Sequence, residues 1–489
     1  MSTSLFTEAQ ERQLADRGIS AAEAQRQIGL MRNESQFARL QRPATIDDGI
    51  RHLNPREEAQ FLELGNDAAR AGRLSKFIPA SGAATRMFQQ FSGLDHDPRT
   101  VDGQGGAEWF TKHAAKLPFG EEQADAATIR ELLYGLDGLA ARPKGLVPFH
   151  RYGVEARTAA EEHMLEAART CCGDDGVARL HFTIPESSRA MFEAAVDRIR
   201  PLLQERFGVR AEVTFSVQDP STDTVACTPE GLPFIDGDGR LVLRPGGHGA
   251  LLRNLERCGG DLVVIRNIDN VVVERDLDLV VRWNLILSGL LSDLEDRSSV
   301  LLALMVHCGT SNILAHIETF LERELGFRPD ENGSIESRKH AAIAILNRPW
   351  RVCGMVRNDG EPGGGPFWIA GDGAPALQII ESAQVDLNDF SQARAWRGAT
   401  HFNPVHLVCG LRDRDGSPFR LADFADPAQS FIIRKTHQGK PLVAMEHPGL
   451  WNGAMARWNT IFVEVPSATF APVKTVADLL RHAHQAVAA

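Results

Sequence analysis

Residues 179–217 read RLHFTIPESSRAMFEAAVDRIRPLLQERFGVRAEVTFSV, and their pattern predicts the fold class. Residues 179–184 alternate polar and apolar side chains as a β-strand does, and residues 211–217 alternate again. Between them, residues 187–206 carry apolar side chains at helical spacing. A strand, a helix and a second strand of this size predict a right-handed crossover in a mostly parallel α/β sheet.

A second strand signal lies further along the chain, at residues 262–265. Their sequence, LVVI, is wholly apolar, which is typical of a strand covered on both faces. The polar sequence RNIDN, residues 266–270, follows directly. Ligands of open α/β sheets bind beyond the carboxyl ends of the strands, so Asp269 is a candidate functional residue, although a helix cap would use the same side chain.

The composition excludes several classes of protein. The chain has 489 residues with Lys+Arg 53 and Asp+Glu 64, a net charge of −11, which argues against nucleic acid as the main partner. At 43% hydrophobic and 24% charged, it has the composition of a folded globular protein. The seven cysteines form no CxxC pair, so neither a disulfide framework nor a structural zinc site is expected.

The start of the chain and one apolar segment bear on location. Residues 1–72 are rich in helix-forming residues and predict an N-terminal helical arm. The first residues lack the pattern of a secretory signal, which favours a cytoplasmic protein with no membrane partner. Residues 298–317 contain no Asp, Glu, Lys or Arg, but polar residues interrupt them, so we interpret them as a buried core helix.

The first segment that can carry chemistry is residues 76–88, KFIPASGAATRMF. Small side chains let phosphate oxygens approach backbone N–H groups, and Arg86 would add a charge-assisted bidentate contact. Taken alone, the segment fits a closely packed helix N-terminus at least as well. The candidate nucleotide-binding residues here are Ala80, Ser81, Gly82, Ala83, Ala84 and Thr85.

Two lysines lie in unusual settings. Lys144 lies between Pro143 and a glycine, where its ammonium can point at a phosphate, although an ordinary solvated lysine fits the local sequence better. Lys474 precedes Thr475 and Asp478, a pair that suits the start of a helix. A cation outside a helix N-terminus opposes the helix dipole unless an anion lies between them.

Another candidate group would recognise a nucleoside. Gln218 can make paired hydrogen bonds to a base edge, or it can be an ordinary turn residue. The turn Gly246, Gly247, His248 and Gly249 can admit a flat base or ribose, or can form a tight hairpin. Asp269 can hold Mg²⁺ with water completing the coordination shell.

In this order, the segments resemble the UDP-sugar pyrophosphorylases and, more broadly, the nucleotide-diphospho-sugar transferase superfamily. Residues 470–480 resemble the phosphate-binding lysine motif of the eukaryotic-type uridylyltransferases, and residues 267–270 resemble their strand-end motif with the metal-binding aspartate. Residues 246–249 are similar to the glycine turn that contacts the nucleoside. Residues 377–384, with Glu381, are similar to the segment that faces the sugar. The nearest relatives are expected in a bacterial family labelled a domain of unknown function.

The signature loop of the superfamily, Ala-Gly-Gly-any-Gly-Thr-Arg-Leu, aligns with Ala80 to Met87. Ser81 and Ala84 replace two of its glycines, which changes the turn or leaves less room for a triphosphate. Lys144 aligns with the downstream lysine of the superfamily. The resemblance spans most of the chain, as islands between long unmatched stretches.

The resemblance implies a mostly parallel, doubly wound core of the nucleotidyltransferase type, similar to the GT-A fold. It makes residues 73–345 a nucleotide-binding α/β core after the N-terminal arm. Residues 346–489 would complete the core and form the acceptor site as a C-terminal lobe.

The implied reaction joins an NTP, with UTP favoured, to a sugar 1-phosphate and releases pyrophosphate. Arg86, Lys144 and Lys474 would neutralise phosphate charge, and Asp269 would hold Mg²⁺ as the cofactor. The candidates for sugar hydroxyls are Glu381, Asn452 and Asn459. Residues 361–366, with Gly363 and Gly364, would close over the acceptor phosphate through their backbone N–H groups, or form a plain surface loop.

Three alternatives stay open. The protein would be a metal-dependent glycosyltransferase that uses a nucleotide sugar, a non-catalytic nucleotide-sugar sensor, or another α/β enzyme. The sensor is compatible with Ser81 and Ala84, whereas two phosphate-binding lysines favour the transferase. The acceptor can be a phosphoalcohol, and neither the base, the oligomeric state nor the role of the N-terminal arm follows from the sequence.

Overall fold

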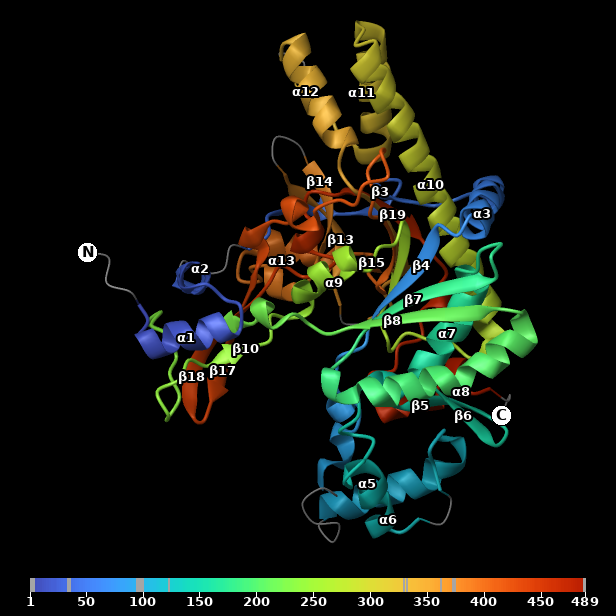
Figure 1. The fold of residues 1–489 in the computed structure, drawn as a ribbon, viewed down its shortest axis with the longest axis vertical. Coiled ribbons are helices and arrows are strands. Elements are labelled where there is room, and N and C mark those ends of the chain that lie inside the picture. Colours follow the sequence, from blue (N-terminus) through green and yellow to red (C-terminus); the bar gives the residue numbers. More distant parts are fainter. Residues whose placement is uncertain are drawn as a thin grey trace.

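The computed structural model describes residues 5–32, 37–93, 101–121, 124–328, 330, 333–360, 363–371 and 375–486. Its centre is a sheet in the order β2–β3–β19–β12–β16–β11–β4–β7–β8, with β15 paired to β12 (Figure 1). Every neighbouring pair on this path is parallel except the two that involve β16. The strands are β2 (Thr45–Ile46), β3 (Gly49–Arg51), β4 (Leu74–Pro79), β7 (Val177–Thr183), β8 (Arg210–Ser216), β11 (Leu262–Arg266), β12 (Trp350–Arg357), β15 (His401–Phe402), β16 (His406–Gly410) and β19 (Asn459–Glu464).

The predicted strand–helix–strand unit is present. Strands β7 and β8 pair in parallel from Val177 with Arg210 to Thr183 with Ser216, and α8 (Arg189–Phe207) connects them. All residues of β11 are buried, as its apolar sequence predicts. The expected mostly parallel α/β core is therefore confirmed.

Different elements cover the two faces of the sheet. Helices α3 (Pro55–Arg70), α7 (Ala159–Thr170), α8 and α10 (Leu277–His307) pack on one face in a single apolar cluster. The other face packs against α9 (Leu252–Arg257) and a small antiparallel sheet. That sheet has the order β1–β13–β14, and α13 (Phe390–Arg397) packs beside it through Trp396, which stacks on Phe367. Its strands are β1 (Leu40–Pro43), β13 (Gly365–Ala370) and β14 (Pro375–Ile380).

The segment interpreted as a buried core helix is not one. Residues 298–317 form the end of α10 and the start of α11 (Ser311–Leu325), which project from the sheet together with α12 (Ile335–Leu346) (Figure 1). Val300 is 59% exposed and Val306 is 53% exposed. The interpretation is wrong because apolar side chains of this segment lie on solvent-exposed faces of the helices as well as on packed ones. The absence of charged residues therefore does not indicate burial here. Among the described helices, none has the combined length and hydropathy needed to span a bilayer.

The N-terminal segment also differs from the prediction. Helices α1 (Glu8–Asp16), α2 (Ala21–Arg32) and α3 lie within the segment predicted to be helical, but β1, β2 and β3 come between α2 and α3. Because β3 pairs with β19 and β1 pairs with β13, the described part of this segment contributes strands to the sheets of the main body and does not form a helical arm. These strands are two to four residues long, too short for a periodic signal.

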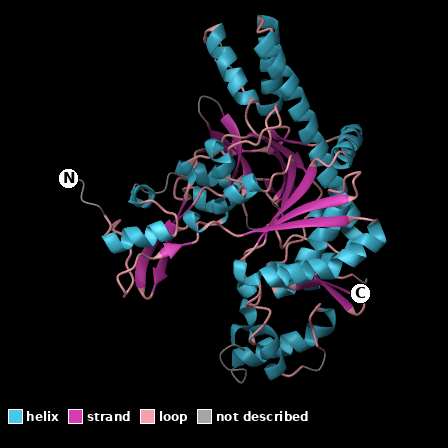
Figure 2. Ribbon diagram, in the orientation of Figure 1, coloured by secondary structure: helices cyan, strands magenta, loops and turns pink. Residues whose placement is uncertain are grey.

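Two smaller lobes flank the core (Figure 2). Helices α1 and α2 share an apolar cluster with the first, whose strands are β9 (Thr224–Val225), β10 (Leu243–Arg244), β17 (Phe431–His437) and β18 (Lys440–Glu446). The second contains α5 (Val101–His113) and α6 (Ala126–Tyr134). The hairpin of β5 (Pro148–Tyr152) and β6 (Glu155–Thr158) leads into α7.

Candidate functional site

The candidate residues follow strands that are neighbours in the sheet. Strands β11, β4, β7 and β8 are adjacent and parallel, so the segments after their carboxyl ends share one edge. Asp269 follows β11, residues 80–86 follow β4, and Gln218 follows β8. This is the edge at which ligands bind in open α/β sheets.

Lys144, Asp269 and Lys474 meet at this edge. The Lys144 Nζ lies 2.8 Å from the Asp269 Oδ2, and the Lys474 Nζ lies 2.9 Å from the same oxygen. Lys144 and Asp269 are largely buried, whereas the Lys474 side chain is 56% exposed. A backbone hydrogen bond of 3.0 Å from the Val473 N–H to the Asp269 carbonyl joins the two segments. Residues far apart in sequence thus form one ionic group.

The charges in this group suit an anion. Burial favours the neutral form of Asp269, but Lys474 and Lys144 outweigh it and hold the pKa of this carboxyl below its usual value. Burial lowers the pKa of Lys144, and Asp269 opposes that shift. Two ammonium groups against one carboxylate leave a net charge of +1 at a partly buried site, where an arriving phosphate meets little screening.

The small-residue loop lies against this group. The Lys144 N–H donates to the Gly82 carbonyl at 2.9 Å, and the Val476 N–H donates to the Met87 carbonyl at 3.2 Å. Ser81, Gly82, Ala83 and Arg86 are exposed beside the lysines. Ala84 is buried at the start of a short 3-10 helix (Ala84–Arg86), where the signature loop has a glycine, and the Thr85 hydroxyl is bonded to the Ala140 carbonyl at 3.3 Å.

Lys474 lies outside a short helix, as predicted. The helix is a 3-10 helix (Val476–Leu480), and Thr475 and Asp478 form the capping box that the sequence indicates. The Lys474 N–H donates to the Asp478 carboxylate at 2.9 Å. Asp269 is therefore the anion that contacts the Lys474 ammonium near this helix terminus, whereas Asp478 accepts only from the Lys474 backbone.

The glycine turn at residues 246–249 is explained first by packing. A Cβ on Gly246 would lie 2.3 Å from the Thr222 carbonyl oxygen, and one on Gly249 would lie 2.1 Å from the Pro448 carbonyl oxygen. The turn therefore lies directly on the segment after Gln218 and on the segment before Trp451. Close packing explains these glycines without a ligand, so contact of the turn with a nucleoside stays a prediction.

His248 from this turn joins a second cluster. Its ring stacks on Trp451 with the centroids 4.3 Å apart, and its Nε2 lies 3.9 Å from the Glu381 Oε1. The Asn452 Nδ2 donates to the Ile379 carbonyl at 2.9 Å, and the Asn452 Oδ1 is buried with no hydrogen-bond partner among the described residues. Burial raises the pKa of Glu381 and lowers the pKa of His248 to about 4. The sequence-predicted Glu381, Asn452 and His248 thus lie together.

Gly364 touches this second cluster. A Cβ on Gly364 would lie 3.0 Å from the Glu381 Cγ, and Gly364 is buried whereas Gly363 is exposed. Glu361 and Pro362 lie outside the described residues. Closure of this segment over a ligand stays a prediction.

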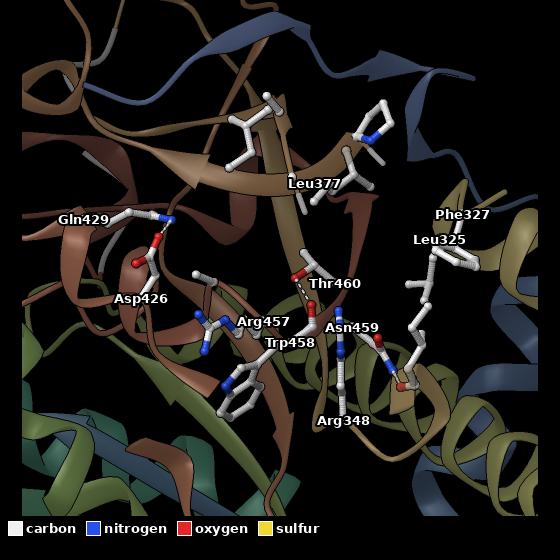
Figure 3. A pocket seen from close by; sticks show the side chains of 17 residues that line it. Leu325, Phe327, Arg348, Leu377, Asp426, Gln429, Arg457, Trp458, Asn459 and Thr460 are labelled. Atoms are coloured by element: carbon white, nitrogen blue, oxygen red, sulfur yellow. Dashed lines mark hydrogen bonds between the residues drawn. The ribbon is translucent and has the colours of Figure 1, made fainter. Parts of the chain in front are cut away.

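Asn459 lies elsewhere, which corrects its prediction as a residue that faces a sugar. It begins β19 at the amino edge of the sheet, opposite the edge with Asp269, and its Nδ2 donates to the Ile345 carbonyl at 2.9 Å. There it lines a cavity of about 280 Å³ with Arg348, Arg457 and Trp458 (Figure 3). The sequence places Asn459 near Asn452 only along the chain, because β19 begins at Asn459 whereas Asn452 precedes that strand.

The donor set for Mg²⁺ is small. The described residues contain no group of three or more His, Cys, Asp or Glu able to hold a metal ion. The Asp269 Oδ1 is buried with no hydrogen-bond partner among those residues, while both lysines contact the Oδ2. One carboxylate oxygen fits Mg²⁺ that arrives with phosphates, because this ion is commonly held by one or two carboxylates plus phosphate oxygens and water.

Sequence reasoning missed Trp451 and the charged residues beneath Asp269. Trp451 had a signal, because an aromatic residue beside Asn452 in a small-residue segment is typical of ligand sites. No such sequence signal marks Lys76, Glu166 and Arg266, because a charged residue in a strand or an amphipathic helix is normally expected to face solvent. All three are buried in the structure.

Several solved structures are similar to this chain. The UDP-N-acetylglucosamine pyrophosphorylase from Trypanosoma brucei, in complex with inhibitor, matches with a TM-score of 0.52 at 14% identity over 98% of this chain and 80% of that one. A mutant UDP-glucose pyrophosphorylase from Leishmania major in complex with UDP-glucose gives 0.45 at 14% identity over 98% and 79%. A UDP-glucose phosphorylase from Trypanosoma brucei gives 0.46 at 13% over 98% and 78%.

The first of these structures confirms the fold that the resemblance implies, since it has the same mixed α/β architecture across nearly the whole chain. None of the curated proteins compared matches this chain. The family described as "Domain of unknown function (DUF4301)" matches residues 7–132 and 110–485. Those residues include both lysines, Asp269 and every strand of the central sheet, and the chain therefore belongs to the DUF4301 family.

Proposed function

We propose that this protein is a nucleotidyltransferase that joins an NTP, with UTP favoured, to a sugar 1-phosphate and releases pyrophosphate. The observation that carries the proposal is the contact of Lys144 and Lys474 with one oxygen of Asp269, beside a loop of small residues. Clustered cations at the carboxyl edge of a parallel sheet suit a reaction whose substrates are both phosphates.

The chemistry asks for no protein nucleophile. An oxygen of the sugar phosphate attacks the α-phosphorus of the NTP, the bond from this phosphorus to the bridging oxygen breaks, and pyrophosphate leaves in line. Each lysine ammonium has three N–H donors and uses one on Asp269, so donors remain for phosphate oxygens. Arg86 would clamp the leaving pyrophosphate through its planar guanidinium.

Mg²⁺ belongs to this proposal as the cofactor. The Asp269 Oδ1 would hold it, and the ion would neutralise charge on the nucleotide phosphates. Lys144 and Lys474 would hold the two phosphate groups close together against their mutual repulsion.

The second cluster would take the sugar. Trp451 and His248 present a stacked aromatic surface, and the Asn452 Oδ1 offers a hydrogen-bond acceptor without a partner among the described residues. Glu381 adds a carboxyl group near this acceptor. Acceptors beside an aromatic surface suit hydroxyl groups on a ring, and Gln218 with the 246–249 turn would bind the nucleoside.

The test measures pyrophosphate release by the purified protein with Mg²⁺, each of the four NTPs, and a panel of sugar 1-phosphates and phosphoalcohols. Turnover with one NTP and acceptor supports the proposal and names both substrates. Transfer of sugar from a nucleotide sugar without pyrophosphate release would support a glycosyltransferase instead. Tight calorimetric binding of a nucleotide sugar with no turnover would support the sensor.

A substitution at Gly364 tests the acceptor end. We expect Gly364→Val to raise the KM for the acceptor by roughly tenfold, the equivalent of about 1.4 kcal/mol, and to leave the KM for the NTP unchanged. The reason is that a Cβ there would lie 3.0 Å from the Glu381 Cγ and would displace that side chain. Steady-state kinetics with each substrate varied in turn measures both constants.

The matched control for this substitution is Gly237→Val, because a Cβ on Gly237 meets no atom within 4 Å. Equal increases in both KM values for Gly364→Val would show that this glycine does not act on the acceptor.

A further inference from the structure

A buried ionic cluster lies beneath the Asp269 segment. Lys76 in β4, Glu166 in α7 and Arg266 at the end of β11 have side chains at most 3% exposed. The Lys76 Nζ lies 2.8 Å from the Glu166 Oε1, and the Arg266 Nε lies 3.9 Å from the same oxygen. The Asn284 Nδ2 also donates to this oxygen, at 2.8 Å. Two cations therefore share one carboxylate in the core.

Arg266 joins this cluster to the segment with Lys474. Its second terminal nitrogen, Nη2, donates to the Asn270 carbonyl at 3.3 Å and to the Thr469 carbonyl at 3.2 Å. Asn270 follows Asp269 directly, and Thr469 precedes Lys474 by five residues. One guanidinium thus bonds both chain segments whose side chains meet at the proposed phosphate site.

Neighbouring contacts hold the same backbone. The His163 Nε2 lies 3.1 Å from the Asn267 carbonyl oxygen, and burial lowers the pKa of His163 to about 3, so the ring stays neutral and donates from this nitrogen. The Ala471 N–H donates to the Asn270 Oδ1 at 3.0 Å. The cluster therefore supports the backbone on both sides of the Asp269 side chain.

Stability alone does not explain why Arg266 is buried in the core. Its Nε and Nη1 have no hydrogen-bond partner among the described residues, and a buried ion pair is often no more stabilising than apolar residues of the same volume. The hydrogen bonds that Arg266 does make are with the two segments of the site.

We propose that Arg266 is a positioning residue, which holds Asp269 and Lys474 in contact through the Asn270 and Thr469 carbonyls, while Glu166 holds the guanidinium from below. The part of this proposal that concerns transfer rests on the proposed function. The part that concerns geometry does not, because the contact between Lys474 and Asp269 can be measured without any substrate.

The first experiment measures the rate at which acetic anhydride modifies Lys474, by mass spectrometry of the full chain after digestion. Lys474 is exposed enough for the reagent, and its ammonium is held by Asp269. In Arg266→Met we expect the rate of Lys474 modification to rise several-fold, toward the rate in Asp269→Ala, which lacks the carboxylate that holds the Lys474 ammonium. The exposed Lys435 and Lys440 serve as internal references.

A matched control separates positioning from general loosening of the core. Arg351 is also fully buried in the same sheet, in β12, but it bonds Trp451, Thr460 and Gln378 instead. Arg351→Met removes an equal buried charge, and we expect the labelling of Lys474 to stay as in the wild type. Should Arg266→Met fail to fold, Arg266→Lys keeps the charge but lacks the planar fork, and we expect a smaller rise in labelling.

The second measurement uses the transferase assay. We expect Arg266→Met to lower kcat by roughly 10- to 100-fold with little change in the KM for the NTP, because a displacement of about 1 Å at the reacting groups has this cost. Unchanged Lys474 labelling in Arg266→Met, an equal rise in Arg351→Met, or raised labelling with an unchanged kcat would each overturn the proposal. A wild type with no transferase activity would overturn the proposed function, while the labelling result would still establish whether Arg266 sets the contact.

Discussion

We expect Lys144→Met to lower kcat for pyrophosphate release by roughly 100- to 1,000-fold, the usual cost of removing one preorganised donor to a developing charge. The Lys144 side chain is 15% exposed, lies 2.8 Å from Asp269, and is fixed by the backbone hydrogen bond from its N–H to Gly82. A phosphate at this site would meet a cation held in place before the reaction. Methionine keeps the length of the side chain and removes only the charge and the donors.

Two further substitutions make this result specific. Lys112→Met, in the last turn of α5, removes an exposed lysine elsewhere and should leave kcat unchanged. Lys474→Met should lower kcat less than Lys144→Met, because the Lys474 side chain is 56% exposed and water screens its charge. Wild-type kcat in Lys144→Met would exclude this lysine from the reaction.

The second large effect is on acid stability. His163, His406 and His484 are buried, and burial lowers the pKa of His163 and His484 to about 3 and that of His406 well below its usual value. The unfolded chain binds protons at these rings below about pH 6.5, whereas the native protein does not. The free energy of unfolding therefore falls as the pH falls, by about 2 kcal/mol per ring at pH 5.

The buried carboxyl group of Glu295 works in the opposite direction. Burial raises the pKa of Glu295 to about 8, so the native protein holds a proton there that the unfolded chain releases above about pH 4.5. Between pH 6.5 and 5 this group offsets about 2 kcal/mol of the roughly 5 kcal/mol from the three rings. We expect these four groups together to give a net loss of about 3 kcal/mol over this range, because the three histidines outweigh the carboxyl group.

Urea unfolding at several pH values measures this loss. His484→Gln should remove about one third of the histidine contribution to the pH slope, and Glu295→Gln should make the slope steeper. A free energy of unfolding that stays constant from pH 6.5 to 5 would show that the rings are accessible to protons in the native state.

Sequence patterns predict the parts of this molecule whose structure is determined by residues close together in the chain. The β7–α8–β8 unit and β11 have periodicities that indicate their structure directly. Lys144, Asp269 and Lys474 each lie in a segment that resembles a motif of the superfamily. Their convergence required the fold, because 125 residues separate Lys144 from Asp269 and 205 separate Asp269 from Lys474.

The predictions that failed concern structure that depends on contacts between residues far apart in the sequence. Strands β1 to β3 are too short for periodicity and exist because partner strands from the other end of the chain accept their hydrogen bonds. Arg266 is buried because Glu166 and two carbonyls surround it, which no window of sequence reveals. The prediction for Asn459 fails because β19 begins at this residue, which therefore lies at the amino edge of the sheet, opposite the edge with Asp269.

The pairing of β3 with β19 has a consequence for synthesis. Ile50 lies opposite Phe462, 412 residues later in the chain, and β19 lies between β3 and β12. During synthesis of this chain, β2 and β3 lack their partner strand and β12 has an unpaired edge. Both conditions last until β19, the last strand of the sheet, is made and pairs with β3 and β12. Such late, long-range closure slows folding and leaves strand edges open to other chains. The sheet therefore becomes complete in a single late step, and nascent chains need protection from aggregation until then.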